Sequence, residues 1–167
     1  MTTRAEVILP VGLGELHVAG SEPAVLMALG LGSCVGVALW DAGAGVGGMA
    51  HVVLPEPFEG DAEPSPKFAL HAVEALIQAV LMRGARRERL RCAIAGGADV
   101  LSGDFTKSLF NIGARNTAAV LLALRRESVQ LVAQDCGGKH GRSLRLTLPE
   151  GRVAVRVLGA EWRELAG

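Results

Sequence analysis

The sequence predicts a mixed α/β fold, a sandwich-like core of mixed β-sheets flanked by two main helices. Short apolar runs bounded by glycine or proline occupy both ends of the chain, a pattern typical of strands. Two segments between them carry apolar residues at helical spacing. Half of the 167 residues are hydrophobic but only 4% are aromatic, so aliphatic side chains must fill the core. We expect one domain, residues 1–167, large enough to bury that core without disulfides or metal.

The predicted strands are short, and turn residues separate them. In chain order they are residues 6–9, 15–18, 25–29, 33–41, 47–54, 91–95, 129–134, 143–148 and 152–158. Gly137-Gly138 and Pro149-Glu150-Gly151 supply the last turns. Strand-rich ends around two helices favour a sandwich over a doubly wound parallel sheet.

Both helices have recognisable ends. Ser65 and Pro66 predict the start of the first helix, as its N-cap and its first helical residue, and Gly84 predicts its end. The second helix is predicted over residues 112–126, with Asn111 as its N-cap.

Composition excludes several function classes. Lys and Arg together number 17, as do Asp and Glu, so no global field attracts nucleic acid or an anionic membrane. With so few aromatic residues, base-stacking platforms are not expected. Apolar runs are too short for membrane insertion, and the acidic Glu6 argues against a signal peptide. Three irregularly spaced cysteines fit reduced thiols in a cytoplasm, and we expect neither metal nor other cofactor.

Cys34 is the most informative residue, because it follows the glycine-spaced run 30–33 and precedes His51 by one hairpin. If the turn centres on residues 42–43, the two face each other with Cβ atoms about 5 Å apart. A turn one or two residues later places them on a diagonal. A thiol beside an imidazole predicts a nucleophile and its base, although a lone cysteine is also a common core residue. Backbone N–H groups around Gly32 and Ser33 could form an oxyanion hole.

The other candidates favour structural roles. We expect Cys92 in the core, Cys136 as a buried turn thiol rather than a second nucleophile, and His71 and His140 near the surface.

Polar residues near the second helix and the following strand are expected to order loops. Arg115 and Asn116 should orient backbone near the site, with direct substrate contact as the alternative. Asp135 should order a turn, and the five arginines over residues 83–91 should be mainly solvated.

Several blocks, in order, resemble the CheD family of chemoreceptor glutamine deamidases of bacterial chemotaxis. The blocks are residues 29–35, His51 with Leu54-Pro55, residues 96–98, residues 112–116, residues 135–138 and Gly141-Arg142. The resemblance as a whole covers roughly residues 6–158. Each block alone is weak evidence for the family, since glycine pairs are common in turns. The order of the blocks and the Cys34–His51 interval make the resemblance specific.

The resemblance implies a cysteine-dependent protein-glutamine glutaminase. It would convert glutamines on the cytoplasmic helices of methyl-accepting chemoreceptors to glutamate, and would also hydrolyse glutamate methyl esters. Cys34 would be the nucleophile and His51 its base. The resemblance also implies a fold like that of toxin-type cysteine deamidases, a cytoplasmic location and a phosphatase partner of the CheC family.

One position departs from the family pattern. The family carries a threonine six residues before the cysteine, where this chain has Ala28. We expect the Ala28 carbonyl to orient the His51 imidazole in place of the missing threonine hydroxyl. Ala28→Thr would then raise the deamidation rate by roughly three- to thirtyfold. Two alternatives remain: a catalytically weak binding module that engages the phosphatase, and a cysteine amidase or peptidase with unrelated substrates.

Overall fold

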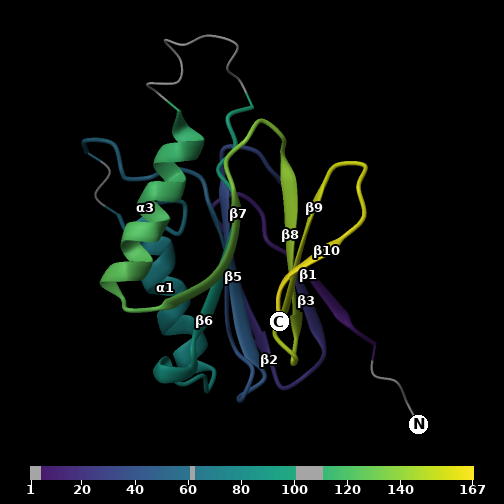
Figure 1. The fold of residues 1–167 in the computed structure, drawn as a ribbon. Helices are drawn as coiled ribbons and strands as arrows, with labels where there is room; N and C mark the ends of the chain where they lie inside the picture. The colour runs from purple at the N-terminus through teal and green to yellow at the C-terminus, as the bar shows by residue number, and fades with distance from the viewer. Residues whose placement is uncertain (1–4, 61–62, 101–110) are drawn as a thin grey trace.

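The protein has three layers in the computed structural model, which describes residues 5–60, 63–100 and 111–167 (Figure 1). Helices α1 (Ala69–Met82) and α3 (Ile112–Arg126) cover one face of a five-stranded sheet. A second five-stranded sheet packs on the other face of the first, and no helix formed by the described residues covers its outer face (Figure 1). The mixed α/β prediction with two main helices is confirmed. The prediction that the N-terminus is not a signal peptide concerns residues 1–4 among others, and these four lie outside the described residues.

Both sheets are mixed. The helix-covered sheet has the order β2 (Leu16–Gly20), β5 (Val46–Val52), β4 (Val35–Asp41), β6 (Arg91–Gly96) and β7 (Gln130–Cys136). The second sheet has the order β1 (Val7–Pro10), β3 (Ala24–Leu31), β8 (Arg142–Leu148), β9 (Arg152–Val157) and β10 (Arg163–Ala166). The β1–β3 and β6–β7 pairs are parallel and the other pairs are antiparallel. A short 3₁₀ helix, η1 (Arg87–Arg89), precedes β6.

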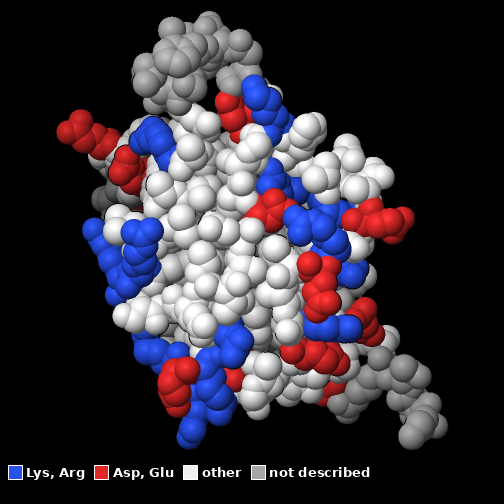
Figure 2. Space-filling view, in the orientation of Figure 1, with Lys and Arg blue, Asp and Glu red and all other residues white. Residues whose placement is uncertain are grey.

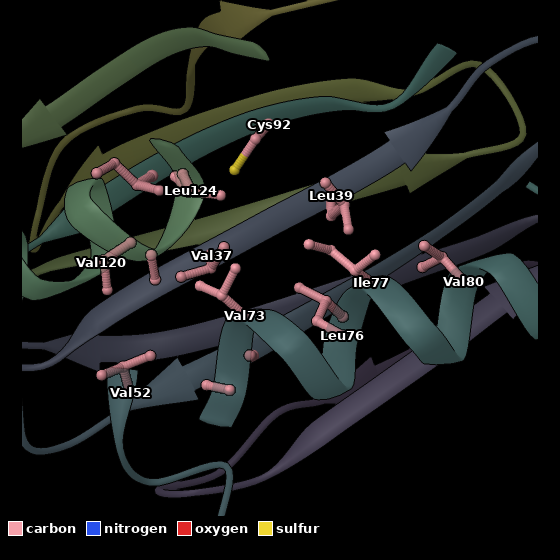
Figure 3. Close-up of a cluster of buried hydrophobic side chains, with 14 of the residues drawn as sticks. Val37, Leu39, Val52, Val73, Leu76, Ile77, Val80, Cys92, Val120 and Leu124 are labelled. Atoms are coloured by element: carbon pink, nitrogen blue, oxygen red, sulfur yellow. The ribbon is translucent and has the colours of Figure 1, made fainter. Parts of the chain in front are cut away.

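Two apolar layers follow from the alternation of side chains along the central strands. On β4, Val37 and Leu39 point to the helices, whereas Ala38 and Trp40 point to the second sheet. Figure 3 shows the first layer, where α1 packs its apolar stripe against the sheet. Cys92 lies in this layer with no exposed surface, as predicted for a core residue. The strands are therefore buried on both faces, which explains why β4 and β5 are apolar apart from Asp41 and His51.

Helix α1 begins later than the sequence predicts. Its N-cap is Phe68, and Ser65 and Pro66 lie in the preceding turn, where the Ser65 hydroxyl accepts from the Lys67 N–H at 3.3 Å. The Lys67 carbonyl accepts hydrogen bonds from residues 53 and 54, at the end of β5. Because Phe68 pairs with Leu54 and is held extended, with φ −98° and ψ 137°, the helix cannot start at Pro66.

The other helix and most strands follow the prediction, with one omission. Helix α3 spans the predicted residues, and the Asn111 Oδ1 accepts from the Ala114 N–H at 3.0 Å. Strand β10 was not predicted, because four residues with two charges carry no usable periodicity. Its position is fixed instead by pairing with β9. The neighbouring Trp162 ring contacts the guanidinium groups of Arg145 and Arg156.

Surface charge is mixed. In the view of Figure 2, acidic and basic side chains intermingle at the right margin, basic ones predominate at the lower left, and uncharged residues occupy the centre. None of the helices in the described ranges is long and apolar enough to cross a membrane. Within the same ranges, no three His, Cys, Asp or Glu side chains come together in a way that would hold a metal ion.

Candidate active site at one end of the sandwich

The β4–β5 register determines how Cys34 and His51 are related. Val35 pairs with Val52 and Asp41 pairs with Val46, so the turn centres on residues 43–44. That is one residue later than the directly opposed arrangement. Continuing the register places position 34 opposite position 53, with His51 on the diagonal, which is the second arrangement that the sequence allowed.

Cys34 and His51 belong to the same apolar layer, between the two sheets. Gly36 pairs directly with His51, and a Cβ at Gly36 would lie 3.0 Å from side-chain atoms of Leu31 and Leu144 in the second sheet. Cys34 itself packs against the inter-sheet cluster. The fold therefore brings the thiol and the imidazole to one layer at the same end of the sandwich.

The hydrogen bond of His51 identifies its basic nitrogen. The side chain is only 3% exposed, and its Nδ1 lies 3.0 Å from the Val11 carbonyl oxygen. A carbonyl can only accept, so Nδ1 carries the proton and donates it to Val11. In the neutral imidazole Nε2 then holds the free lone pair. Nε2 is buried and has no hydrogen-bond partner within the part of the chain that the structure describes.

A short loop fixes the Val11 carbonyl. The Val11 N–H donates to the Met27 carbonyl at 2.8 Å, and the Gly12 N–H donates to the Glu15 carboxylate at 2.8 Å. That second bond is the main reason why the pKa of Glu15 lies below its usual value. The loop is also tied to β5, because the His51 N–H donates to the Glu15 carbonyl.

Sequence reasoning missed Val11, because a backbone carbonyl forty residues from its histidine leaves no side-chain signal. Ala28 was expected to supply this carbonyl. The structure records the Nδ1 hydrogen bond with Val11 instead, while Ala28 is fully buried in the inter-sheet cluster. A role for Ala28 beside His51 stays a prediction.

Glycines let the loop that carries Cys34 lie close to neighbouring backbone. The Cys34 carbonyl accepts from the Gly97 N–H and the Gly32 carbonyl accepts from the Ala98 N–H, both at 2.8 Å. Gly96 has φ +114°, and a Cβ there would collide with the Cys34 carbonyl oxygen. The N–H groups of Gly32 and Ser33 have no backbone acceptor recorded among the described residues.

Burial determines the protonation state of the thiol. It raises the pKa of Cys34, and a backbone N–H hydrogen bond opposes this effect only in part. The free thiol is therefore protonated at neutral pH. A nucleophilic Cys34 needs a base that removes its proton during attack, rather than a thiolate formed in advance.

Asn116 connects the loop of Cys34 to the end of β5. Its side chain is fully buried, and its amide nitrogen donates to the carbonyls of Ser33 and Val53, each at 2.9 Å. This confirms that Asn116 orients backbone near the candidate site. Arg115 does not share that role, because it pairs with Glu56 at the surface at 2.9 Å.

Asp135 orders the β7–β8 loop, as predicted. The buried Arg142 donates to the backbone and carboxylate oxygens of Asp135 and to the carbonyls of Gly137 and His140. The Gly137 N–H in turn donates to the Gly96 carbonyl.

The chain is thus a mixed α/β sandwich protein with a cysteine and a histidine at the same end of its inter-sheet layer. Comparison with known proteins identifies its family. Residues 53–157, more than half of the chain, match the family described as CheD chemotactic sensory transduction. The chain belongs to the CheD family.

Relatives extend the match to most of the chain, including the cysteine and histidine segments. The chain is 46% identical over 157 residues to a probable chemoreceptor glutamine deamidase CheD of Symbiobacterium thermophilum, covering 93% of this chain and 95% of the relative. A protein of the same name from Moorella thermoacetica is 45% identical over 151 residues, covering 89% and 90%. A probable chemoreceptor glutamine deamidase CheD 2 of Geobacter metallireducens is 41% identical over 160 residues, covering 95% and 98%.

We expect iodoacetamide to label Cys34 in preference to Cys92 and Cys136 near neutral pH. Cys92 is fully buried, and burial raises the pKa of Cys136 to about 11. Cys136 also packs in the helix layer, away from His51. Peptide mapping after brief labelling of the folded protein measures the preference. Faster labelling of Cys136 would contradict the prediction and place the reactive thiol on the helix-covered face of the sheet, away from His51.

Proposed function

We propose that this protein is a protein-glutamine deamidase that hydrolyses glutamine side-chain amides on the cytoplasmic helices of methyl-accepting chemoreceptors. The observation that carries the proposal is the Nε2 of His51, which has no partner among the described residues and lies in the same layer as the Cys34 thiol. The names of the relatives give the substrate class. The protein would act in the cytoplasm, where these receptor helices lie.

In the first half of the reaction, His51 acts as a general base. Its Nε2 takes the thiol proton while the Cys34 sulfur attacks the side-chain carbonyl carbon of glutamine. The N–H groups of Gly32 and Ser33 would stabilise the oxyanion, which is consistent with their lack of recorded backbone acceptors among the described residues. The imidazolium then protonates the amide nitrogen, the carbon–nitrogen bond breaks, and ammonia leaves.

In the second half, water replaces ammonia. Nε2 takes a proton from water, the resulting hydroxide attacks the thioester, and the carbon–sulfur bond breaks. Cys34 recovers its proton from His51, and the product is a glutamate carboxylate. The same steps would hydrolyse a glutamate methyl ester, with methanol in place of ammonia.

Mass spectrometry of receptor cytoplasmic fragments incubated with the protein tests the proposal. Each deamidated glutamine should gain about one dalton, because nucleophilic hydrolysis replaces an amide by an acid. The absence of that gain, with a folded protein and intact receptor glutamines, would contradict the proposal. A gain only on unrelated proteins would favour a cysteine amidase of different specificity.

The Val11 hydrogen bond changes what we expect from Ala28→Thr. Because Nδ1–H already has an acceptor, an added hydroxyl should change kcat by less than about threefold. Ala28→Val is the matched control, since it adds the same volume at this buried position without a hydroxyl. Deamidation rates of the three proteins decide the question. A three- to thirtyfold rise in the deamidation rate of Ala28→Thr, without a rise for Ala28→Val, would indicate that a hydroxyl at position 28 orients His51.

Ala28 also motivates a second candidate function, a catalytically weak binding module. Such a protein would engage a chemotaxis phosphatase of the CheC family. It would bind that phosphatase without changing the mass of receptor fragments, whereas the deamidase changes the mass with or without the phosphatase.

A further inference from the structure

The amide of Asn116 lies where β4 and β5 stop pairing. The last pair of their ladder is Val35 with Val52, so Ser33 and Val53 lie just beyond it. The Asn116 Nδ2 donates to both carbonyls, each at 2.9 Å, and so joins the two chain segments where the ladder no longer does. One segment continues into Cys34, and the other is two residues from His51.

The two acceptors fix the orientation of this amide. Carbonyl oxygens accept only, so the NH₂ group must face Ser33 and Val53, and Oδ1 must point away from them. Oδ1 is buried and has no partner among the residues described. An unsatisfied buried acceptor is unfavourable, so the two donated hydrogen bonds are what Asn116 contributes to this site.

Helix α3 is docked closely enough to hold the amide in place. A Cβ at Gly113, one turn before Asn116, would collide with the backbone of Gly97 and with the Ala98 carbonyl oxygen. Gly97 and Ala98 are the residues whose N–H groups hold the carbonyls of Cys34 and Gly32. Helix, glycine loop and cysteine loop therefore form one connected unit.

We propose that Asn116 is a positioning residue for the Cys34–His51 pair. It acts through the backbone on both sides of the pair and sets the separation of thiol and imidazole. This inference rests on the proposed function, in which Nε2 must reach the thiol proton. Small displacements of reacting groups cost on the order of a hundredfold in rate, so loss of the amide donors should reduce kcat far more than it changes KM.

Two variants and one control test the inference. Asn116→Asp keeps the side-chain shape but places a carboxylate against two carbonyl oxygens, and Asn116→Ala removes the group. Arg115→Ala is the matched control from the same helix turn, because its side chain lies at the surface with Glu56. Circular dichroism and thermal melting identify which variants are folded.

The readout is the iodoacetamide alkylation rate of Cys34 between about pH 6 and pH 9, where proton loss controls thiol reactivity. Each variant is measured with His51 present and in the His51→Gln background. We expect Asn116→Ala to slow alkylation about tenfold with His51 present and less than about twofold in the His51→Gln background. Arg115→Ala should change neither rate.

Equal slowing in both backgrounds, or no slowing, would overturn the inference. So would failure of both Asn116 variants to fold, because Asn116 would then be a determinant of folding. The outcomes separate this inference from the proposed function. If Asn116 and His51 are coupled but receptors stay unchanged, the inference holds and the proposed substrate is wrong. If receptors are deamidated without such coupling, only the inference is wrong.

Discussion

Cys34→Ser should abolish receptor deamidation, lowering kcat by on the order of 10³-fold or more. The hydroxyl is a far weaker nucleophile at neutral pH than a thiol with an adjacent base. Serine fits the same space, so the fold should be unchanged and the melting temperature should stay close to that of the wild type. The measurement is the mass gain of receptor fragments over time at a fixed protein concentration.

Cys136→Ser is the matched control for this experiment. Cys136 is also partly buried, at the end of β7, but it packs in the layer between the sheet and the helices. We expect this variant to retain wild-type deamidation. Activity retained in Cys34→Ser and lost in Cys136→Ser would relocate the site to the other face of the sheet.

Local sequence restricted the relation between Cys34 and His51 to a few arrangements without choosing among them. A glycine-rich turn between two apolar strands restricts the register to a few alternatives, and each of them keeps the two residues at the same end of the hairpin. Asn116 could also be anticipated, because an amide near the start of a helix commonly bonds local backbone. Its two acceptors could not, since they lie more than sixty residues away.

Long-range pairing explains the features that could not be predicted from local sequence. The start of α1 moved because the Lys67 carbonyl pairs with the end of β5, which overrides a good N-cap signal at Ser65. The Val11 carbonyl reaches His51 only because β1 and β2 belong to different sheets and their connection passes the end of β5. Such contacts depend on the packing of the layers, and no motif encodes them.

The same packing determines the chemistry of the pair. Burial raises the pKa of the Cys34 thiol, so a preformed thiolate is disfavoured at neutral pH. In the proposed mechanism His51 removes the thiol proton through a free lone pair. The Val11 hydrogen bond leaves that lone pair on Nε2, which has no partner among the described residues. A buried histidine with one partnered nitrogen is therefore better suited to serve as a base than a fully hydrogen-bonded one.

His51→Gln should remove most of the activity while preserving the fold. Glutamine can keep an N–H donor toward the Val11 carbonyl, but its amide has no basic nitrogen, and loss of a general base lowers the rate by about 10²- to 10⁴-fold. His51→Ala should lose both activity and stability. It leaves a cavity beside an unpaired Val11 carbonyl in a side-chain site that is only 3% exposed, at a cost of about 1–3 kcal/mol.

Deamidation rates and thermal melting of the two variants separate catalysis from packing. If glutamine restores the melting temperature but not the rate, the missing function is the free Nε2 lone pair. If His51→Gln deamidates receptors nearly as fast as the wild type, His51 only supports the Val11 loop, and another group must remove the proton from Cys34.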